Sequence, residues 1–221
     1  MHKGKAWCFI LVLTLVLSLM ATVPRQVLAQ TQEGIQLYGT GDFQGAEKAL
    51  RAALKANPQD VQASYFLGLS LLQQEKHEEA LALFLKVKDA QDKAVGKARS
   101  PLPDAYQIQI ALARAHLELK KLPEAWKNLE AAKAAHADTA ELHVFRGAYY
   151  IQKPDIHKAI QELEKAMAMD AKDAYAHYYA GHAYLRDGNP QRAVELFKEF
   201  LQLAPLAPEA YKTKALIDAL C

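Results

Sequence analysis

A block of 34 residues recurs five times along this chain of 221 residues. In each copy a small residue is followed twelve residues later by an alanine, and four residues further on by a large apolar residue. Self-similarity at a period of about 20 to 50 residues indicates a chain that stacks one supersecondary unit against the next. The small residues are Gly34, Gly68, Ala113, Gly147 and Gly181, the alanines are Ala46, Ala80, Ala125, Ala159 and Ala193, and the large residues are Leu50, Phe84, Leu129, Leu163 and Phe197.

Each block is predicted to form two helices joined by a short turn. Glycine, proline and charged residues mark the turns at 41–42, 120–123, 153–155 and 187–190. The chain is rich in alanine and leucine, and strand-forming residues do not alternate over any long stretch, so an all-α fold is predicted. We expect the small residue to let the first helix approach the second, and the alanine to meet it there. The predicted units cover residues 30–60, 61–94, 106–139, 140–173 and 174–207.

An insertion interrupts this period once. The small residues lie 34, 45, 34 and 34 residues apart, so the second unit is followed by 11 extra residues, 95–105. Because this stretch contains Gly96, Pro101 and Pro103, it is predicted to be a longer hairpin end followed by a proline-rich loop. Two interpretations stay open: an insertion that the fold tolerates, since loops accept added length at low cost, or a loop that projects toward a partner.

The blocks also share a sequence pattern. Phe66-Leu67-Gly68 is followed by Ala80 and Phe84, and Gly181 is followed by Tyr184, Ala193, Phe197 and Pro205. With these residues the chain resembles the tetratricopeptide repeat (TPR) family over residues 27–207. The resemblance implies a right-handed α-solenoid of five helix-turn-helix repeats. The chain departs from the family where an aromatic residue, often Trp, precedes the small residue by four places, because the five copies carry Gln30, Ser64, Gln109, His143 and His177.

Both ends of the array are expected to be capped. In the first unit Gln30 and Glu33 are polar where the family is apolar, which suits a terminal helix that faces water and a leader outside the fold. Residues 208–221 are predicted to form a capping helix over the last unit. The residues expected to face the last unit are Tyr211, Ala215, Leu216 and Leu220.

The N-terminus has the order of an export signal. Two lysines precede an apolar run over residues 6–23, and a Pro-Arg-Gln break leads into Val27-Leu28-Ala29. Residues 1–29 are therefore predicted to be a signal peptide that is cleaved before Gln30. An uncleaved N-terminal membrane anchor is the alternative, because the apolar run is near the length that spans a bilayer. In both cases the rest of the chain is expected outside the cytoplasm, either periplasmic or secreted, or anchored in the inner membrane facing the periplasm.

Charge argues against nucleic-acid binding. Lys3, Lys5 and Arg25 belong to the leader, so 24 of the 27 basic residues remain to balance 25 acidic ones. No basic stripe is left to follow a phosphate backbone. The export signal, the absence of a disulfide framework and the absence of an N-x-[ST] sequon in the mature chain together favour a bacterial cell envelope.

No motif for catalysis, a cofactor or a metal is present. The sequence has no G-x-S-x-G, no H-E-x-x-H and no phosphate-binding glycine loop. His143 and His177 occupy equivalent places in adjacent units, but a metal site needs three or four convergent ligands and no third is evident. Cys8 lies in the leader, so Cys221 is expected to be a passive tail residue, with a disulfide-linked dimer as the alternative.

The resemblance implies that the first helices of the repeats line a concave groove. Positions six and three before the small residue, and one, four and five after it, share one helical face. Tyrosines there combine large contact area with a polar tip, and arginines can pair with a carboxylate of a ligand. For any single position, packing against the neighbouring hairpin is the alternative. The predicted groove residues are Tyr65, Leu69, Leu72, Ile110, Arg114, Leu117, Val144, Ile151, Tyr175, Tyr178, His182 and Arg186.

The predicted function is a non-catalytic scaffold of the cell envelope that binds a segment of a partner protein in this groove. Membrane contact is expected only through the N-terminal segment, if that segment stays uncleaved. A self-assembling structural protein, and hence a homo-oligomer, is one alternative. An enzyme built on the helical frame is another, with Glu118 and Glu141 as the acidic candidates in the groove.

Overall fold

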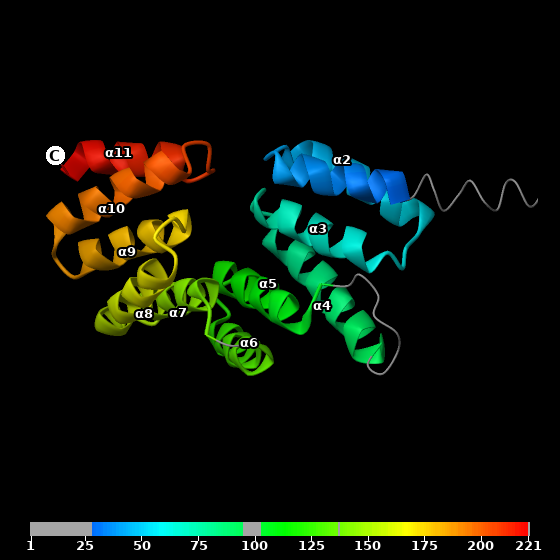
Figure 1. Cartoon of the computed structure of the whole chain (residues 1–221), viewed down its shortest axis with the longest axis horizontal. Coiled ribbons are helices and arrows are strands. Elements are labelled where there is room, and N and C mark those ends of the chain that lie inside the picture. The colour runs from blue at the N-terminus through cyan, green and yellow to red at the C-terminus, as the bar shows by residue number, and fades with distance from the viewer. Residues whose placement is uncertain (1–27, 95–102, 137, 221) are drawn as a thin grey trace, which may run out of the picture. The chain divides into compact units, whose positions relative to one another are not determined.

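The computed structural model describes residues 28–94, 103–136 and 138–220 (Figure 1). Every regular element in these ranges is a helix. The described residues divide into two compact units, one ending before and one beginning at residue 103. Each unit is a series of helix pairs in chain order, which confirms the predicted all-α fold class.

The first unit contains two helix pairs. Residues 28–39 are helical and lie against α2 (Phe43–Ala56), where Gly34 meets Leu50. The second pair consists of α3 (Val61–Leu72) and α4 (His77–Ala94), and α2 also packs against α3. Helix α4 has 18 residues where α2 has 14, and it ends just before the predicted insertion. The proline-rich part of the predicted loop, residues 95–102, lies outside the described residues.

The second unit contains three helix pairs and a final helix. Within each pair the two helices pack along their length, and the first helices α5, α7 and α9 also contact one another in order. This arrangement places the first helices side by side on one face of the unit. The pairs are α5 (Ala105–Glu118) with α6 (Leu122–Ala135), α7 (Ala140–Gln152) with α8 (Ile156–Met169), and α9 (Ala174–Arg186) with α10 (Pro190–Leu203), and the final helix is α11 (Ala210–Leu220).

Local sequence explains where the helices begin and end. Asp60, Thr139 and Asp173 precede α3, α7 and α9, and each side chain accepts a hydrogen bond from a backbone N–H in the first helical turn. Gly41 and Gly188 adopt φ values of +82° and +81° in two of the hairpin turns, a conformation that glycine reaches without steric cost.

The close approach predicted within the helix pairs exists at the glycine positions, where the large residue of the second helix lies nearest. A Cβ added to Gly68 would lie 2.6 Å from Cε1 of Phe84, and one added to Gly181 would lie 2.5 Å from Cε1 of Phe197. The three atoms nearest to each added Cβ all belong to the phenylalanine ring. The large residue covers the glycine because it lies one helical turn beyond the alanine on the same face of the second helix. The alanines and the large residues are all fully buried in the five copies.

Polar side chains replace the family's aromatic residue inside two of the pairs. His143 on α7 is buried and hydrogen-bonds through Nδ1 to Glu162 on α8. In the preceding pair Asn128 donates from Nδ2 to Oε1 of Gln109 at 2.6 Å, and its Oδ1 lies 2.9 Å from Nδ1 of His116. These hydrogen bonds satisfy groups that would otherwise be costly to bury.

The first helix of the fold exposes a polar residue to solvent, as predicted for a terminal helix. Glu33 is exposed, whereas Thr31 is buried and donates to Oδ2 of Asp60 at 2.8 Å. Leu28, ahead of these contacts, is 66% exposed. None of the helices within the described ranges is long and apolar enough to cross a membrane.

The capping helix forms as predicted, and two of the four residues expected to face the last pair, Leu216 and Leu220, pack against it. Ile217 packs with Val194 and Phe197 of α10, with Leu216 and Leu220 partly buried beside it. The expectation that Tyr211 and Ala215 face the last pair was wrong, since Tyr211 is 84% exposed and Ala215 is also exposed. The spacing of Thr213, Ile217 and Leu220, at four and three residues, defines the covered stripe.

The contact between Gly68 and Phe84 gives a first prediction. Replacing Gly68 with Ala gains about 1 kcal/mol of helix propensity but overpacks a fully buried ring, at a cost of roughly 1–3 kcal/mol. We therefore expect a net loss of up to about 2 kcal/mol in the free energy of unfolding, measured by urea denaturation. Gly39→Ala is the matched control, because nothing lies within 4 Å of its added Cβ. A Gly68→Ala protein more stable than the Gly39→Ala protein would contradict the packing argument.

Candidate functional site

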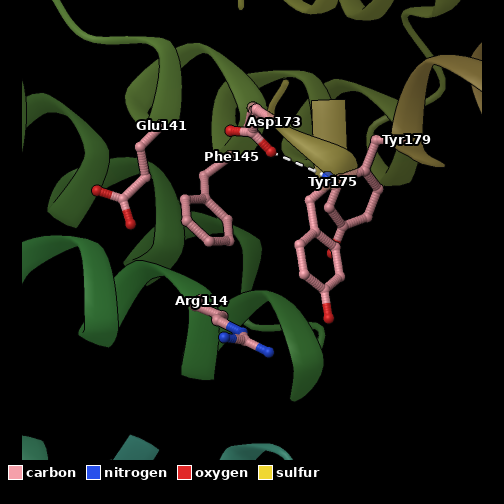
Figure 2. A pocket seen from close by; sticks show the side chains of 7 residues that line it. Arg114, Glu141, Phe145, Asp173, Tyr175 and Tyr179 are labelled. Carbon is pink, nitrogen blue, oxygen red and sulfur yellow. Dashed lines mark hydrogen bonds between the residues drawn. The ribbon is translucent and has the colours of Figure 1, made fainter. Parts of the chain in front are cut away.

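A small pocket opens between the first helices of the second unit. It has a volume of about 130 Å³. Figure 2 shows Glu141 and Phe145 on one side, Tyr175 and Tyr179 on the other, and Arg114 reaching in from α5. We call the surface around it the tyrosine face, which comprises Arg114, Glu118, Glu141, Tyr175, Tyr178 and Tyr179.

The repeat itself brings these side chains together. Glu141 and Tyr175 each lie six residues before the small residue of their unit, and Phe145 and Tyr179 each lie two before it. Because α7 and α9 pack side by side, residues at the same phase become neighbours across the helices. Asp173 enters as the residue that caps the N-terminus of α9, where its Oδ1 accepts from the backbone N–H of Tyr175 at 2.9 Å.

Five of the predicted groove residues are buried. Each keeps less than a tenth of its surface accessible, so in the free protein these side chains support the first helices and offer little area to a partner. This is the packing alternative that the sequence left open for individual positions. The five residues are Leu72, Ile110, Leu117, Val144 and Ile151.

Tyr178 and His182 are partly exposed and rest on the core of the last pair. The ring of Tyr178 lies 5.0 Å from that of Phe200 and 4.7 Å from that of His182, and His182 lies 5.0 Å from Phe197. Burial, together with the nearby positive charge of Arg186, lowers the pKa of His182. His182 is therefore a neutral aromatic neighbour of Tyr178 at physiological pH.

Arg186 is exposed, and its guanidinium makes a structural hydrogen bond within the protein. Its Nη1 donates to the backbone carbonyl of Ile151 at 2.6 Å, which ties the end of α9 to the end of α7. Gln152 makes the equivalent hydrogen bond one repeat earlier, from Nε2 to the carbonyl of Leu117 at 3.2 Å. The position five residues after the small residue thus joins successive first helices.

The predicted residues of the first unit lie on α3. Tyr65 is partly exposed, and its ring lies 5.5 Å from Phe66 and 5.9 Å from Phe84. Leu69 is also partly exposed, one turn further along the same helix. These two side chains therefore leave some apolar area accessible on α3.

Negative charge predominates around the pocket. Glu141 keeps an exposed surface, but partial desolvation of its carboxylate, followed by the charges of Asp173 and Asp104, raises its pKa. The Tyr106 hydroxyl and the Arg114 guanidinium act in the opposite direction. Burial and the carboxylates of Glu209 and Glu118 raise the pKa of Tyr178 to about 12. The tyrosine hydroxyls are therefore neutral hydrogen-bonding groups across the physiological range.

The pocket suits one side chain better than a cofactor or a reaction centre. Pockets for drug-sized ligands and cofactors measure about 300–1,000 Å³, whereas this one measures about 130 Å³. In the described part of the chain, no cluster of three or more His, Cys, Asp or Glu residues is arranged to hold a metal ion. What the pocket offers a ligand is aromatic contact area, carboxylates and one guanidinium.

Part of this pocket lies outside the groove face predicted from the sequence. Phe145 and Tyr179 lie two residues before the small residue, a position left out of the predicted groove face, and Asp173 is a helix cap. A usable signal existed, because an aromatic residue recurs at that position in two successive units. Glu141 had been placed on the groove face without being chosen as a site residue.

Comparison with known proteins agrees with the helix pairs described above. A tetratricopeptide repeat family model matches residues 31–95 and 146–208, which is more than half of the chain. Among curated proteins none matches the sequence.

Several solved structures share the fold at low identity. A thermophilic TPR protein of Thermus thermophilus is 22% identical, with a TM-score of 0.67 over 88% of this chain and 98% of its own. A chain of the APC/C hetero-tetramer Cut9–Hcn1 is 17% identical, with a TM-score of 0.69 over 89% of this chain and 37% of its own. A MamA fragment from Desulfovibrio magneticus RS-1 is 19% identical, with a TM-score of 0.55 over 81% of this chain and 96% of its own. These similarities establish the fold alone.

The charge around the pocket gives a second prediction. The folded-state pKa of Glu141 lies above its ordinary value, so stability falls as the pH rises through the unfolded and then the folded pKa. Glu141→Gln removes this cost, and we expect a higher melting temperature than wild type at pH 7. The gain should shrink as the pH approaches about 4, where the native carboxyl becomes protonated.

The control for this prediction is the same chemical change at Glu199, which is exposed on α10. Calorimetry of the wild type and the two variants at both pH values makes the measurement. A Glu141→Gln protein less stable than wild type at pH 7 would contradict the assigned electrostatics.

Proposed function

Because this chain belongs to the tetratricopeptide repeat family, we propose that it is a non-catalytic scaffold that holds a partner protein by one segment on the tyrosine face. The family identity supports a role in protein–protein interaction. The choice of the tyrosine face rests on the pocket between α5, α7 and α9.

The single observation that carries this proposal is the combination of partly exposed tyrosines with a side-chain-sized pocket. Tyr175, Tyr178 and Tyr179 stand on one helix and are all partly exposed. Tyrosine is over-represented among the residues that dominate binding energy, because it buries a large area and keeps a hydrogen-bonding tip. A pocket of about 130 Å³ beside them gives one anchoring side chain of a partner a place to enter.

The arrangement does not favour the enzymatic alternative. Glu118 is exposed on α5, and Glu141 borders a pocket with a guanidinium and three aromatic rings. Catalysis by a carboxylate pair would need two acids arranged about a substrate with pKa values driven apart. The charged groups around Glu141 serve equally well to attract a charged group of a ligand.

We also propose that the scaffold acts outside the cytoplasm, in the cell envelope. The signal-like order of residues 1–29 is the basis for this. Exposure of Leu28 and Ala29 supports a cleavage site there, because their removal leaves the packed contacts of Thr31 and Gly34 in place.

The binding proposal predicts a third outcome. A Glu141→Ala, Tyr175→Ala double variant should lose most of the partner captured by the wild type, because both side chains line the pocket. The measurement is affinity purification of the tagged full-length chain from crosslinked native envelopes, read by mass spectrometry. The matched control is Glu199→Ala with Tyr211→Ala, which removes the same residue types from exposed positions on α10 and α11.

Circular dichroism of both double variants checks that the helices persist. A discrete partner lost only from the pocket variant supports the proposal. Capture of the same partner by both variants would move the binding site elsewhere. Recovery of the protein alone, unchanged by either variant, would favour the self-assembling alternative.

The export proposal predicts a fourth outcome. Intact-mass analysis of the protein purified from cell envelopes should give a chain that begins at Gln30. Replacing Ala29 with a bulky residue such as Phe should block this processing, since signal peptidase sites require small residues. A wild-type chain that retains residues 1–29 and stays in the membrane fraction would favour the uncleaved anchor, and one in the cytosolic fraction would contradict export.

A further inference from the structure

We propose that the pocket of the tyrosine face receives a basic side chain, arginine or lysine, from the partner's segment. This inference rests on the proposed function and narrows the chemistry of the partner. It follows from the size of the pocket, the sign of the charge around it and the nature of its walls.

The size of the pocket selects a single extended side chain. Its volume of about 130 Å³ is well below the roughly 300–1,000 Å³ of pockets for drug-sized ligands and cofactors. That space accepts one long side chain and excludes a folded element or a nucleotide. The pocket lies between three first helices, so the backbone of the partner would run across α5, α7 and α9.

Charge complementarity then selects the sign of the occupant. The carboxylates that act on Glu141, Tyr178 and Tyr179 come from Asp104, Glu118, Asp173 and Glu209, and Arg114 is the cation that acts against them. Counted with Glu141 itself, carboxylates clearly outnumber this guanidinium. An anionic side chain would meet Arg114 but also these acids, whereas a cation would relieve their mutual repulsion.

The walls of the pocket suit a cation that also carries apolar surface. Phe145, Tyr175 and Tyr179 present aromatic rings beside the carboxylates of Glu141 and Asp173 (Figure 2). Aromatic faces attract guanidinium and ammonium groups, and their edges pack well on the methylene stem of lysine or arginine. A carboxylate at one end and rings along the sides are the two contacts that such a side chain makes best.

Binding of isolated amino-acid amides tests the preference directly. The probes are N-acetyl-arginine amide, N-acetyl-lysine amide, N-acetyl-norleucine amide and N-acetyl-glutamate amide, each titrated into the full-length chain labelled with ¹³C in its phenylalanine rings. The resonance of Phe145, assigned from a Phe145→Leu variant, reports on the pocket, and Phe43 in the first unit is the internal reference. We expect the arginine and lysine amides to move Phe145 with millimolar dissociation constants and the glutamate and norleucine amides to leave it unmoved.

Three variants make the test specific. Glu141→Gln and Asp173→Asn should each weaken arginine-amide binding about tenfold, because each removes one charge-assisted hydrogen bond. Asn keeps the helix-capping role of Asp173, so α9 should stay folded. Arg114→Gln should tighten binding, since it removes the competing cation. Glu199→Gln, an exposed change on α10, should have no effect.

Two outcomes would overturn the proposal. One is binding of the glutamate amide that depends on Arg114, which would make the pocket an anion site. The other is the absence of a Phe145 shift with either basic amide. Both leave the scaffold function standing if the envelope partner is still lost from the Glu141→Ala, Tyr175→Ala variant. If the pocket binds arginine selectively but no envelope partner is captured, the side-chain preference stands and the scaffold role does not.

Discussion

The contact on which the structure depends is the one between a first-helix glycine and the large side chain of the second helix. At Gly68 and Gly181 even one added carbon would come within 2.6 Å of a phenylalanine ring. This proximity sets the distance between the two helices of a pair, and the fully buried alanines maintain it along the second helix. Because four of the five copies repeat this contact, successive first helices also repeat their orientation within a unit. The tyrosine face is a result of that repetition.

Much of the fold could be predicted from the sequence because its determinants are periodic. The small, alanine and large positions of the repeat, together with glycine and aspartate at the turns, identified the helix pairs. Residue size alone does not rank the neighbours of the glycine by distance. The sequence does not say which of two residues one turn apart, Ala80 or Phe84, points at Gly68. The error at Tyr211 had a similar origin, since an isolated final helix offers several apolar stripes.

The candidate site could be predicted only in part. The helical phase correctly brought Arg114 and Tyr175 to one pocket, because their offsets share a face of the first helices. It could not tell that Ile110 and Val144, on the same nominal face, are buried against neighbouring helices. Nor did it anticipate Asp173, since the role of a helix cap as a pocket wall depends on how adjacent helices are staggered. These features depend on contacts between repeats, which the period of a single repeat does not encode.

The bonds that Gln152 and Arg186 make to the carbonyls of the preceding first helix have a consequence for the energetics of recognition. They fix the spacing of α5, α7 and α9 before any ligand arrives, and Tyr175 is further held by its hydroxyl, which donates to Glu209 at 3.2 Å. A surface that is already preorganised loses little conformational entropy on binding, so most of that cost falls on the incoming segment. Short segments that are stiff when free are therefore the ligands that such a surface would hold for longest.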